Sequence, residues 1–304
     1  MRIIAEIGSN WATFEHAKDS ISLAKNCGAW AVKFQLYDGK ALYGAEGPMA
    51  NEMPVEWIPR LAEKAKACGI EFMCTAFSPE FAEAVNPYVN YHKVASSDLT
   101  HLRLLEKLNS FKKPVFLSTG ASGEADIAMA LRQLKDCPVT LMYCVAEYPA
   151  RVINFKYLEA LKKYGRPVGY SDHSLDAVVV PMEAMRRGAE VIEKHVNLVG
   201  VTNTPDAPHS LSLDEFKAMC QAIEGKTDFH SSERDMRLRH NRRLIAIKPI
   251  AKGDKLIEGE NFGAYRSLTQ DTEGLSPWLI PEIDGKRLAK EDRQMGQPIR
   301  PQTI

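Results

Sequence analysis

The sequence predicts an α/β protein whose main part is a closed (β/α)8 TIM barrel, followed by a small β-rich domain. Short runs rich in β-branched and aromatic residues alternate with helix-length amphipathic segments through the first 225 residues. Eight such strand–helix units favour a closed barrel over an open doubly wound sheet. From Leu244 onward, short apolar runs are instead broken by turn residues, which indicates a separate module.

Each unit of the predicted barrel pairs one strand with one helix. The strands are expected at 2–7, 31–35, 71–75, 91–94, 114–118, 139–144, 168–171 and 191–195. The helices are expected at roughly 15–26, 55–68, 79–86, 101–109, 124–135, 154–163, 176–187 and 212–224. Gly28 and Gly69 follow helical runs, where a C-terminal glycine belongs.

The change of pattern after the barrel predicts three segments. The barrel occupies residues 1–225, a linker occupies 226–243, and the small domain occupies 244–304. The linker ends in a basic run at 237–243, which is short and lacks interleaved aromatic residues. We therefore interpret that run as a solvated linker face and not as a nucleic-acid patch.

The overall composition is typical of a water-soluble globular protein. The 304 residues are 45% hydrophobic and 26% charged, and the 39 basic residues balance the 39 acidic ones. A formal charge of zero favours neither a nucleic acid nor an anionic membrane as partner. The six cysteines lack zinc-site spacing, and we expect reduced, buried thiols. With no leader pattern and no membrane-length apolar stretch, a cytoplasmic location is expected.

Polar side chains gather near the C-terminal ends of the predicted strands, where barrels of this class collect their chemistry. In strand order they are Glu6 and Asn10; Lys33 and Gln35; Thr75; Lys93, Ser96 and Asp98; Ser118, Thr119 and Gly120; Tyr148; Ser171, Asp172 and His173; and Glu193, Lys194 and His195. Because strand side chains alternate, Lys33 with Gln35 and Glu193 with His195 point to the same side. Any one of them could simply bond to loop backbone, but their repetition favours a site.

Two histidines predict a cation site. His173 and His195 end neighbouring strands at similar depth, and neutral imidazoles are ligands for divalent metals. Asp172 and Glu193 lie near enough in the sequence to orient a ligand. A single histidine at a strand end is more often only hydrogen-bonded, so the prediction depends on the pair. Two protein ligands would leave positions open for water and substrate oxygens.

An anion site is predicted beside the histidines. Lys33 and Lys93 face the barrel mouth, and Ser96, Ser118 and Ser171 offer hydroxyl donors. Phosphate suits such a set because its oxygens accept several charge-assisted hydrogen bonds at once. In an alternative interpretation Lys33 pairs with an acidic residue across the barrel, and the two interpretations are compatible.

Several short segments resemble one enzyme family. They are 5–10, 32–35, 93–96, 117–120, 147–149, 169–173, 191–195 and 205–206, and they read AEIGSN, VKFQ, KVAS, LSTG, EYP, GYSDH, VIEKH and PD. The family they resemble is that of the N-acetylneuraminate (sialic acid) synthases with their legionaminic and pseudaminic acid synthase relatives. The segments follow the family's order and span the barrel. Residues 244–304 resemble the family's antifreeze-like (SAF, β-clip) domain.

The resemblance implies a metal-dependent carbon–carbon bond-forming transferase. Its substrates would be phosphoenolpyruvate and an N-acylated amino-sugar aldehyde similar to N-acetylmannosamine, and its products a sialic-acid-type nonulosonic acid and phosphate. The metal would be manganese, with magnesium or cobalt as alternatives, on His173 and His195. The other implied roles are phosphoenolpyruvate binding by Lys33, Lys93, Ser96, Ser118 and Ser171; catalysis by Glu6, Asp98 and Glu193; and sugar binding by Gln35, Thr75, Phe77, Tyr148, Asp206 and Arg266. Arg266 would reach a partner's active site, which implies a domain-swapped homodimer.

Two other functions are considered. A 3-deoxy-octulosonate or arabino-heptulosonate type synthase would act on a different, phosphorylated aldose, and no second basic cluster on the barrel clearly supplies its extra phosphate site. A barrel that binds sugar without catalysis would explain Asp98 and Ala146, which depart from the family's pattern. The presence of both histidines and both lysines argues against it. An antifreeze role is the weakest interpretation, because fold does not imply function.

Overall fold

The structure is a computed structural model that describes residues 1–44, 51–225, 242–265 and 274–304. The chain divides into two compact units, Met1–Thr227 and Asp228–Ile304. Arg266, which we expect to contact sugar, lies outside the described residues. In the described part of the chain, no helix is long and apolar enough to cross a membrane.

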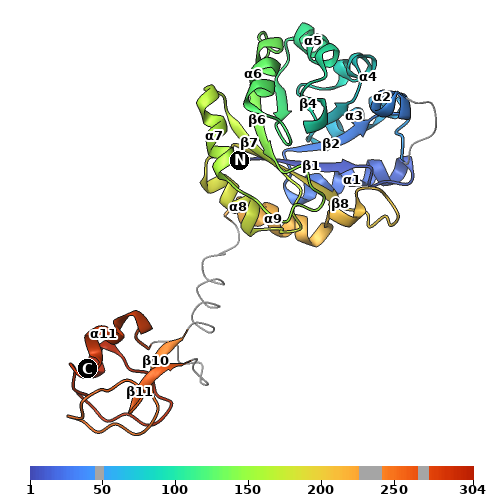
Figure 1. The fold of residues 1–304 in the computed structure, drawn as a ribbon. Helices are drawn as coiled ribbons and strands as arrows, with labels where there is room; N and C mark the ends of the chain where they lie inside the picture. The colour runs from blue at the N-terminus through green and yellow to red at the C-terminus, as the bar shows by residue number, and fades with distance from the viewer. Residues whose placement is uncertain (45–50, 226–241, 266–273) are drawn as a thin grey trace. The chain divides into compact units, whose positions relative to one another are not determined.

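The first unit is a closed barrel of eight parallel strands, which confirms the predicted fold class (Figure 1). The strands are β1 (Arg2–Gly8), β2 (Ala31–Leu36), β3 (Glu71–Ala76), β4 (His92–Val94), β5 (Val115–Ser118), β6 (Val139–Cys144), β7 (Val168–Asp172) and β8 (Val191–Asn197). Pairing of β1 with β8 closes the barrel, with Glu6 in register with His195. A two-residue strand, β9 (Leu211–Ser212), extends the sheet beside β8.

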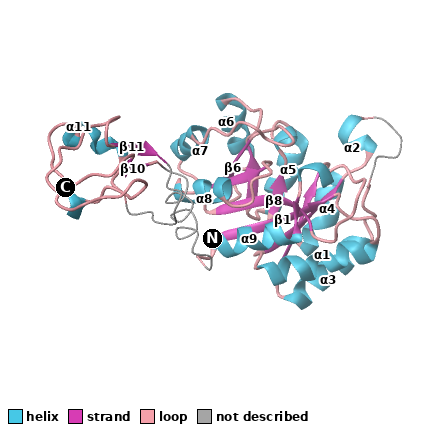
Figure 2. Ribbon diagram, turned by 90° about the horizontal axis from the view of Figure 1, so that it is seen from below, coloured by secondary structure: helices cyan, strands magenta, loops and turns pink. Residues whose placement is uncertain are grey.

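Helices lie around the outside of the strands (Figure 2). They are α1 (Phe14–Cys27), α2 (Gly39–Tyr43), α3 (Trp57–Cys68), α4 (Pro79–Val85), α5 (Leu102–Phe111), α6 (Glu124–Gln133), α7 (Lys156–Leu161), α8 (Val179–Arg186) and α9 (Leu213–Ile223). Thr13 and Ser78 cap α1 and α4 through their hydroxyl groups. Helix α2 was not expected, because five residues are too few to show a helical period.

The barrel interior changes from apolar to polar along each strand. Its apolar floor is a separate buried cluster formed by Ile4, Ala31, Met73, Phe116, Met142 and Val191. Since side chains alternate, the next inward position on each of these strands lies two residues later. Those positions carry Glu6, Lys33, Thr75, Ser118, Cys144 and Glu193. The same alternation that fills the floor therefore places polar groups at the mouth.

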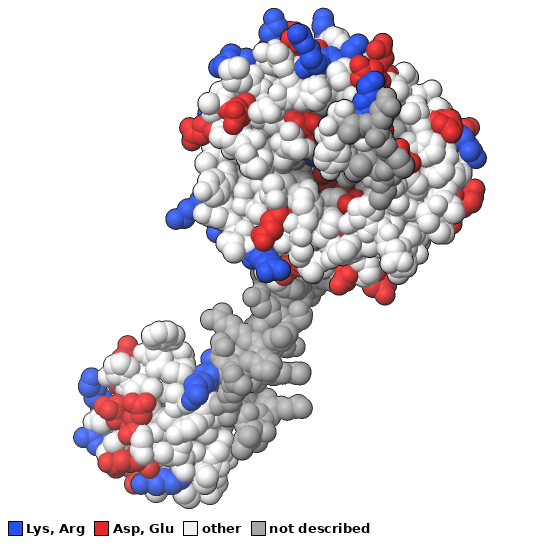
Figure 3. Space-filling model, turned by 45° about the vertical axis from the view of Figure 1, so that its right-hand side comes forward, with Lys and Arg blue, Asp and Glu red and all other residues white. Residues whose placement is uncertain are grey.

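The second unit has its own small core. Strand β10 (Arg243–Ala246) pairs antiparallel with β11 (Phe262–Tyr265), and a short helix, α11 (Ile280–Ile283), follows. The buried side chains are Leu244, Ala246, Ile250, Leu256, Phe262, Ile283, Ala289 and Ile299. The strands are short, as expected, and isolated bridges such as Ile250 with Arg293 add to them. On the face shown in Figure 3, acidic and basic residues are interspersed.

Candidate active site

A narrow cavity opens at the C-terminal ends of the barrel strands. Every one of the eight strands, or the residues just after it, contributes to its wall. The lining residues are Glu6, Lys33, Gln35, Thr75, Phe77, Lys93, Ala95, Ser96, Ser118, Cys144, Tyr148, Ser171, His173, Glu193 and His195. Most of the site residues expected from the sequence thus lie together around one space. Ala95 and Cys144 are the two wall residues that sequence reasoning did not single out.

Two buried lysines flank one carboxylate. Lys33 Nζ lies 2.6 Å from Glu6 Oε2, and Lys33 also donates to Thr75 Oγ1 at 2.8 Å. Lys93 Nζ donates to Ser118 Oγ at 2.7 Å. Both ammonium groups lie 3.7 Å from Glu193 Oε1. Lys33 therefore does pair with acidic residues, Glu6 on the neighbouring strand β1 and Glu193 on β8, and both lysines still line the cavity.

Glu193 is the central anion of this network. Its Oε1 accepts a hydrogen bond of 3.1 Å from Ser171 Oγ, while its buried Oε2 has no hydrogen-bond partner among the described residues. Burial acts to raise the pKa of Glu193, but Lys33 and Lys93 outweigh it and hold that pKa below its usual range. Glu193 is therefore ionised at neutral pH.

Glu6 behaves differently although it is also fully buried. Burial raises its pKa to about 7, against the lowering effect of Lys33. Gln35 Nε2 donates a hydrogen bond of 2.7 Å to Glu6 Oε1. The pKa of Glu6 is therefore raised and that of Glu193 is lowered within one cavity. Active sites use such a difference when one carboxyl group transfers a proton and the other stays ionised.

The two predicted metal ligands, His173 and His195, are uncharged and lie close together in space. Burial lowers the pKa of His173 to about 3 and that of His195 to about 4. The His173 Nδ1 lies 2.8 Å from the Val145 carbonyl oxygen, which favours a proton on Nδ1 and leaves the Nε2 lone pair available. Their ring centroids are 5.6 Å apart, and the Tyr148 ring stacks on His173 at 4.0 Å.

Asp172 does not take the ligand-orienting position that we expected. Lys194 Nζ donates to Asp172 Oδ2 at 2.7 Å, and both side chains are completely buried. The same ammonium group donates to the Ser174 and Asp176 carbonyl oxygens at 2.5 and 2.9 Å. Ser171, His173, Glu193 and His195 point into the cavity. Because strand side chains alternate, Asp172 and Lys194 between them point to the other side of the sheet, and their ion pair lies outside the cavity.

Asp98 is not one of the residues that line the cavity, although the charge of the wall residue Lys93 acts on it. It ends a 3-10 helix, Ser96–Asp98, that follows β4, and its carboxylate accepts a hydrogen bond of 3.0 Å from Ser97. The turn places Ser96 at the cavity, where its hydroxyl accepts a 3.0 Å hydrogen bond from the Gly120 amide. Burial raises the pKa of Asp98. Its catalytic role stays a prediction.

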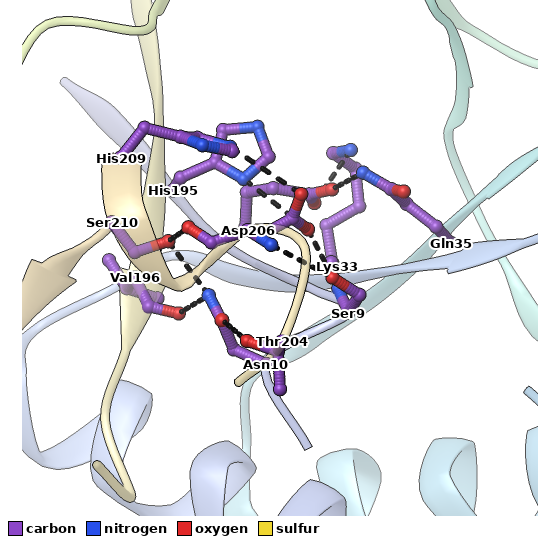
Figure 4. A network of polar contacts seen from close by, with 12 residues as sticks. Ser9, Asn10, Lys33, Gln35, His195, Val196, Thr204, Asp206, His209 and Ser210 are labelled. Carbon is purple, nitrogen blue, oxygen red and sulfur yellow. Dashed lines mark hydrogen bonds and ion pairs between the residues drawn. The ribbon is translucent and has the colours of Figure 1, made fainter. Parts of the chain in front are cut away.

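Asp206 lies beside the cavity with a histidine that sequence reasoning missed (Figure 4). Asp206 Oδ2 is 3.8 Å from His195 Nδ1, and Asp206 Oδ1 is 3.4 Å from His209 Nε2. His209 ends the 3-10 helix Ala207–His209 in the loop after β8. No strand or helix period marks such a loop, so the sequence offered no signal for it.

The family of this chain follows from comparison with known proteins. The model of the NeuB family matches residues 20–233. The chain is 35% identical over 277 residues to the uncharacterized protein MJ1065 of Methanocaldococcus jannaschii, covering 84% of this chain and 81% of that one. It is 31% identical over 328 residues to a pseudaminic acid synthase of Campylobacter jejuni, covering 95% and 92%.

A solved structure agrees with these relatives. The sialic acid synthetase of Leptospira borgpetersenii, in complex with citrate, aligns with a TM-score of 0.69 and 28% identity. The alignment covers 77% of this chain and 90% of that one. Sequence and fold therefore point to the same group, and this chain belongs to the NeuB family.

Proposed function

We propose that this chain joins phosphoenolpyruvate to an N-acylated amino-sugar aldehyde similar to N-acetylmannosamine. The products are a sialic-acid-type nonulosonic acid and phosphate. One observation carries the proposal: two buried lysines flank the Glu193 carboxylate in the same cavity as two neutral, buried histidines. The names of the pseudaminic and sialic acid synthase relatives support the same reaction class.

Phosphoenolpyruvate binding is assigned to the lysine side of the cavity. Lys33 and Lys93 supply two ammonium groups, and the hydroxyl groups of Ser96, Ser118 and Ser171 lie on the same wall. The phosphate and carboxylate of the substrate accept charge-assisted hydrogen bonds from such donors. Because Glu193 lies 3.7 Å from each lysine, it keeps the cationic pair balanced before the anion arrives.

The reaction forms one carbon–carbon bond. C3 of phosphoenolpyruvate attacks the aldehyde carbon, water then adds at C2, and the C–O bond to phosphate breaks. Glu6, with its pKa raised to about 7, is suited to transfer a proton near neutral pH. Glu193 stays ionised and is suited to accept hydrogen bonds from the attacking water.

The donor set of the cavity fits a divalent metal. His173 and His195 would hold it, and both are neutral, which is the form that binds metals. The buried Nδ1 of His195 has no hydrogen-bond partner among the described residues. When bound, such a cation polarises a carbonyl oxygen as a Lewis acid. Manganese is our proposal, with magnesium or cobalt as alternatives.

The sugar is assigned to the remaining side of the mouth. Gln35, Thr75, Phe77 and Tyr148 line the cavity there, and Asp206 lies beside His195. We further propose that the second unit is an antifreeze-like domain and that the protein is a domain-swapped homodimer. Arg266 of the partner subunit would then complete the sugar site. The resemblance to sialic acid synthases supports this part of the proposal.

The test is phosphate release from phosphoenolpyruvate. Metal-loaded protein is incubated with N-acetylmannosamine and its 2,4-diacetamido relatives, and the sugar acid is identified by mass spectrometry. We expect release that needs one sugar, stops with chelator and stops in His195→Ala. The matched control, His16→Ala on α1, keeps the wild-type rate. Absence of release with every sugar, from folded and metal-loaded protein, would refute the proposal.

A further inference from the structure

A third buried histidine, His209, lies beside the proposed metal site in the loop after β8. His209 is only 8% exposed, and its Nε2 has no hydrogen-bond partner among the described residues. The centroid of the His209 ring lies 4.8 Å from the ring centroid of His195 and 4.8 Å from the ring centroid of Tyr148. His209 has no role in the proposed reaction.

Two unpartnered imidazole nitrogens converge on one carboxylate. His195 Nδ1 and His209 Nε2 lie 3.8 and 3.4 Å from the two oxygens of Asp206. Both distances exceed the usual range for a hydrogen bond. The three ligand atoms all lie within 4.8 Å of one another. Ligands bound about 2.1 Å from one cation at angles near 90–110° lie about 3.0–3.5 Å apart, so binding one cation draws the most distant of these atoms together by roughly 1 Å or more.

The Asp206 side chain is 14% exposed, and its polar neighbours include the Ser9 amide and two histidines. Among the described residues, no lysine or arginine lies within 4 Å of it. A buried carboxylate is usually paired with a cation or bound to a metal. Asp206 thus places a carboxylate between two imidazoles, a donor set that a divalent cation fits.

The loop that carries Asp206 and His209 is held in place by hydrogen bonds (Figure 4). Ser9 donates its amide to Asp206 Oδ2 at 2.8 Å, and Ser210 Oγ donates to the Asp206 carbonyl at 2.7 Å. Asn10 Nδ2 in turn donates to Ser210 Oγ at 2.7 Å, and Thr204 Oγ1 donates to Asn10 Oδ1 at 2.6 Å. Such supporting contacts are what orients metal ligands.

We propose that His195, Asp206 and His209 bind a divalent transition-metal cation together. Asp206 and His209 thus add two ligands to those expected from the pair of His173 and His195. Two imidazoles and one carboxylate favour manganese, iron, cobalt or zinc over magnesium, which prefers oxygen ligands. The catalytic role of this cation rests on the proposed function, whereas its binding is measurable without either substrate.

Cobalt binding to the full chain tests the ligand set. Metal-stripped protein is titrated with Co²⁺ by calorimetry and visible absorption, without phosphoenolpyruvate or sugar. We expect His209→Phe, which keeps a ring against Tyr148, to weaken Co²⁺ binding about 10- to 100-fold and to change the ligand-field bands. Asp206→Asn weakens binding as well, while His16→Phe on α1 leaves it unchanged. Circular dichroism of each metal-free variant verifies folding.

One result overturns the inference directly. If folded His209→Phe keeps the wild-type dissociation constant and absorption bands, His209 is not a ligand. A second measurement covers the case in which a variant does not fold: anomalous scattering from wild-type crystals soaked in Co²⁺. We expect the ion at bonding distance from His209. An ion on His173 and His195 with His209 apart contradicts the inference.

The phosphate-release assay separates this inference from the proposed function. Suppose that cobalt binding needs His209 but the protein releases no phosphate with any sugar. That result supports the ligand set and refutes the proposed reaction. Suppose instead that phosphate release depends on metal but the His209→Phe variant binds Co²⁺ as tightly as the wild type. That result supports the reaction and refutes the ligand set.

Discussion

The backbone amide of Ser9 donates a 2.8 Å hydrogen bond to Asp206 Oδ2, although 197 positions separate the two residues. Ser9 directly follows β1, and Asp206 lies in the loop after β8. The bond therefore joins the first and last strands of the barrel at its mouth. It depends on Gly8, which has a φ of +54° and on which a Cβ atom would stand 2.1 Å from Asp206 Oδ2.

The close approach of Gly8 to Asp206 leaves no room for a side chain at position 8. Gly8→Ala should displace Asp206 and weaken Co²⁺ binding, and it should lower the free energy of unfolding by about 1–3 kcal/mol through backbone strain. The control is Gly165→Ala, since Gly165 has a φ of +66° and nothing within 4 Å of its would-be Cβ. The Gly165→Ala variant therefore has the same kind of backbone strain as Gly8→Ala but no steric clash with a neighbouring side chain. Equal effects of the two variants on metal binding would contradict the prediction.

Lys93→Met should weaken phosphoenolpyruvate binding. The substitution removes an ammonium group that donates to Ser118 and lies 3.7 Å from Glu193, while it keeps much of the side-chain volume. Hydrogen bonds to charged groups contribute about 1.5–3 kcal/mol, so we expect a loss of about tenfold or more in affinity. Calorimetric titration without sugar measures it.

A matched lysine variant controls for general effects. Lys113 donates to the Asn86 and Val89 carbonyl oxygens and does not line the cavity. Lys113→Met should therefore bind phosphoenolpyruvate as the wild type does. If Lys93→Met also binds normally, Lys93 is not part of the anion site.

The ion pair of Asp172 and Lys194 should be structural. Asp172→Asn leaves a completely buried ammonium group without its charged partner, and such a loss typically lowers the free energy of unfolding by about 3–5 kcal/mol. Urea denaturation measures the change. The exposed pair of Lys107 and Glu83 is the control, because Glu83→Gln should change stability by less than about 1 kcal/mol. A similarly small effect at Asp172 would show that the pair is not a buried support.

His92 should make folding stability depend on pH. Burial, assisted by Lys113, lowers its pKa from 6.5 to about 4. Between those values the unfolded chain binds a proton at this residue and the folded protein does not. Stability therefore rises with pH through this window and falls on acidification, by on the order of 1 kcal/mol per pH unit.

The measurement is urea denaturation of the wild type and His92→Gln at several pH values from 4 to 6.5. The difference in the free energy of unfolding between the two proteins should change across the window. The wild type should lose more stability than the variant as the pH falls. Parallel curves for the two proteins would disprove a buried, neutral His92.

The sequence by itself determined the barrel and the composition of its mouth. Strand positions follow from β-branched runs, and all eight observed strands lie within two residues of those expected. The period of two then predicted that Lys33 with Gln35 and Glu193 with His195 face the interior. That rule is local, so it needs no knowledge of the rest of the chain.

Only the tertiary structure decided what the loops do. His209 reaches His195 because a network around Asn10 and Asp206 holds the loop after β8 against the end of β1, between residues 197 and 200 positions apart. Lys194 takes Asp172 as its partner through contact between two strands, and the turn after β4 places Ser96 on the cavity wall. Such contacts form between residues distant in sequence, and no periodic pattern encodes them.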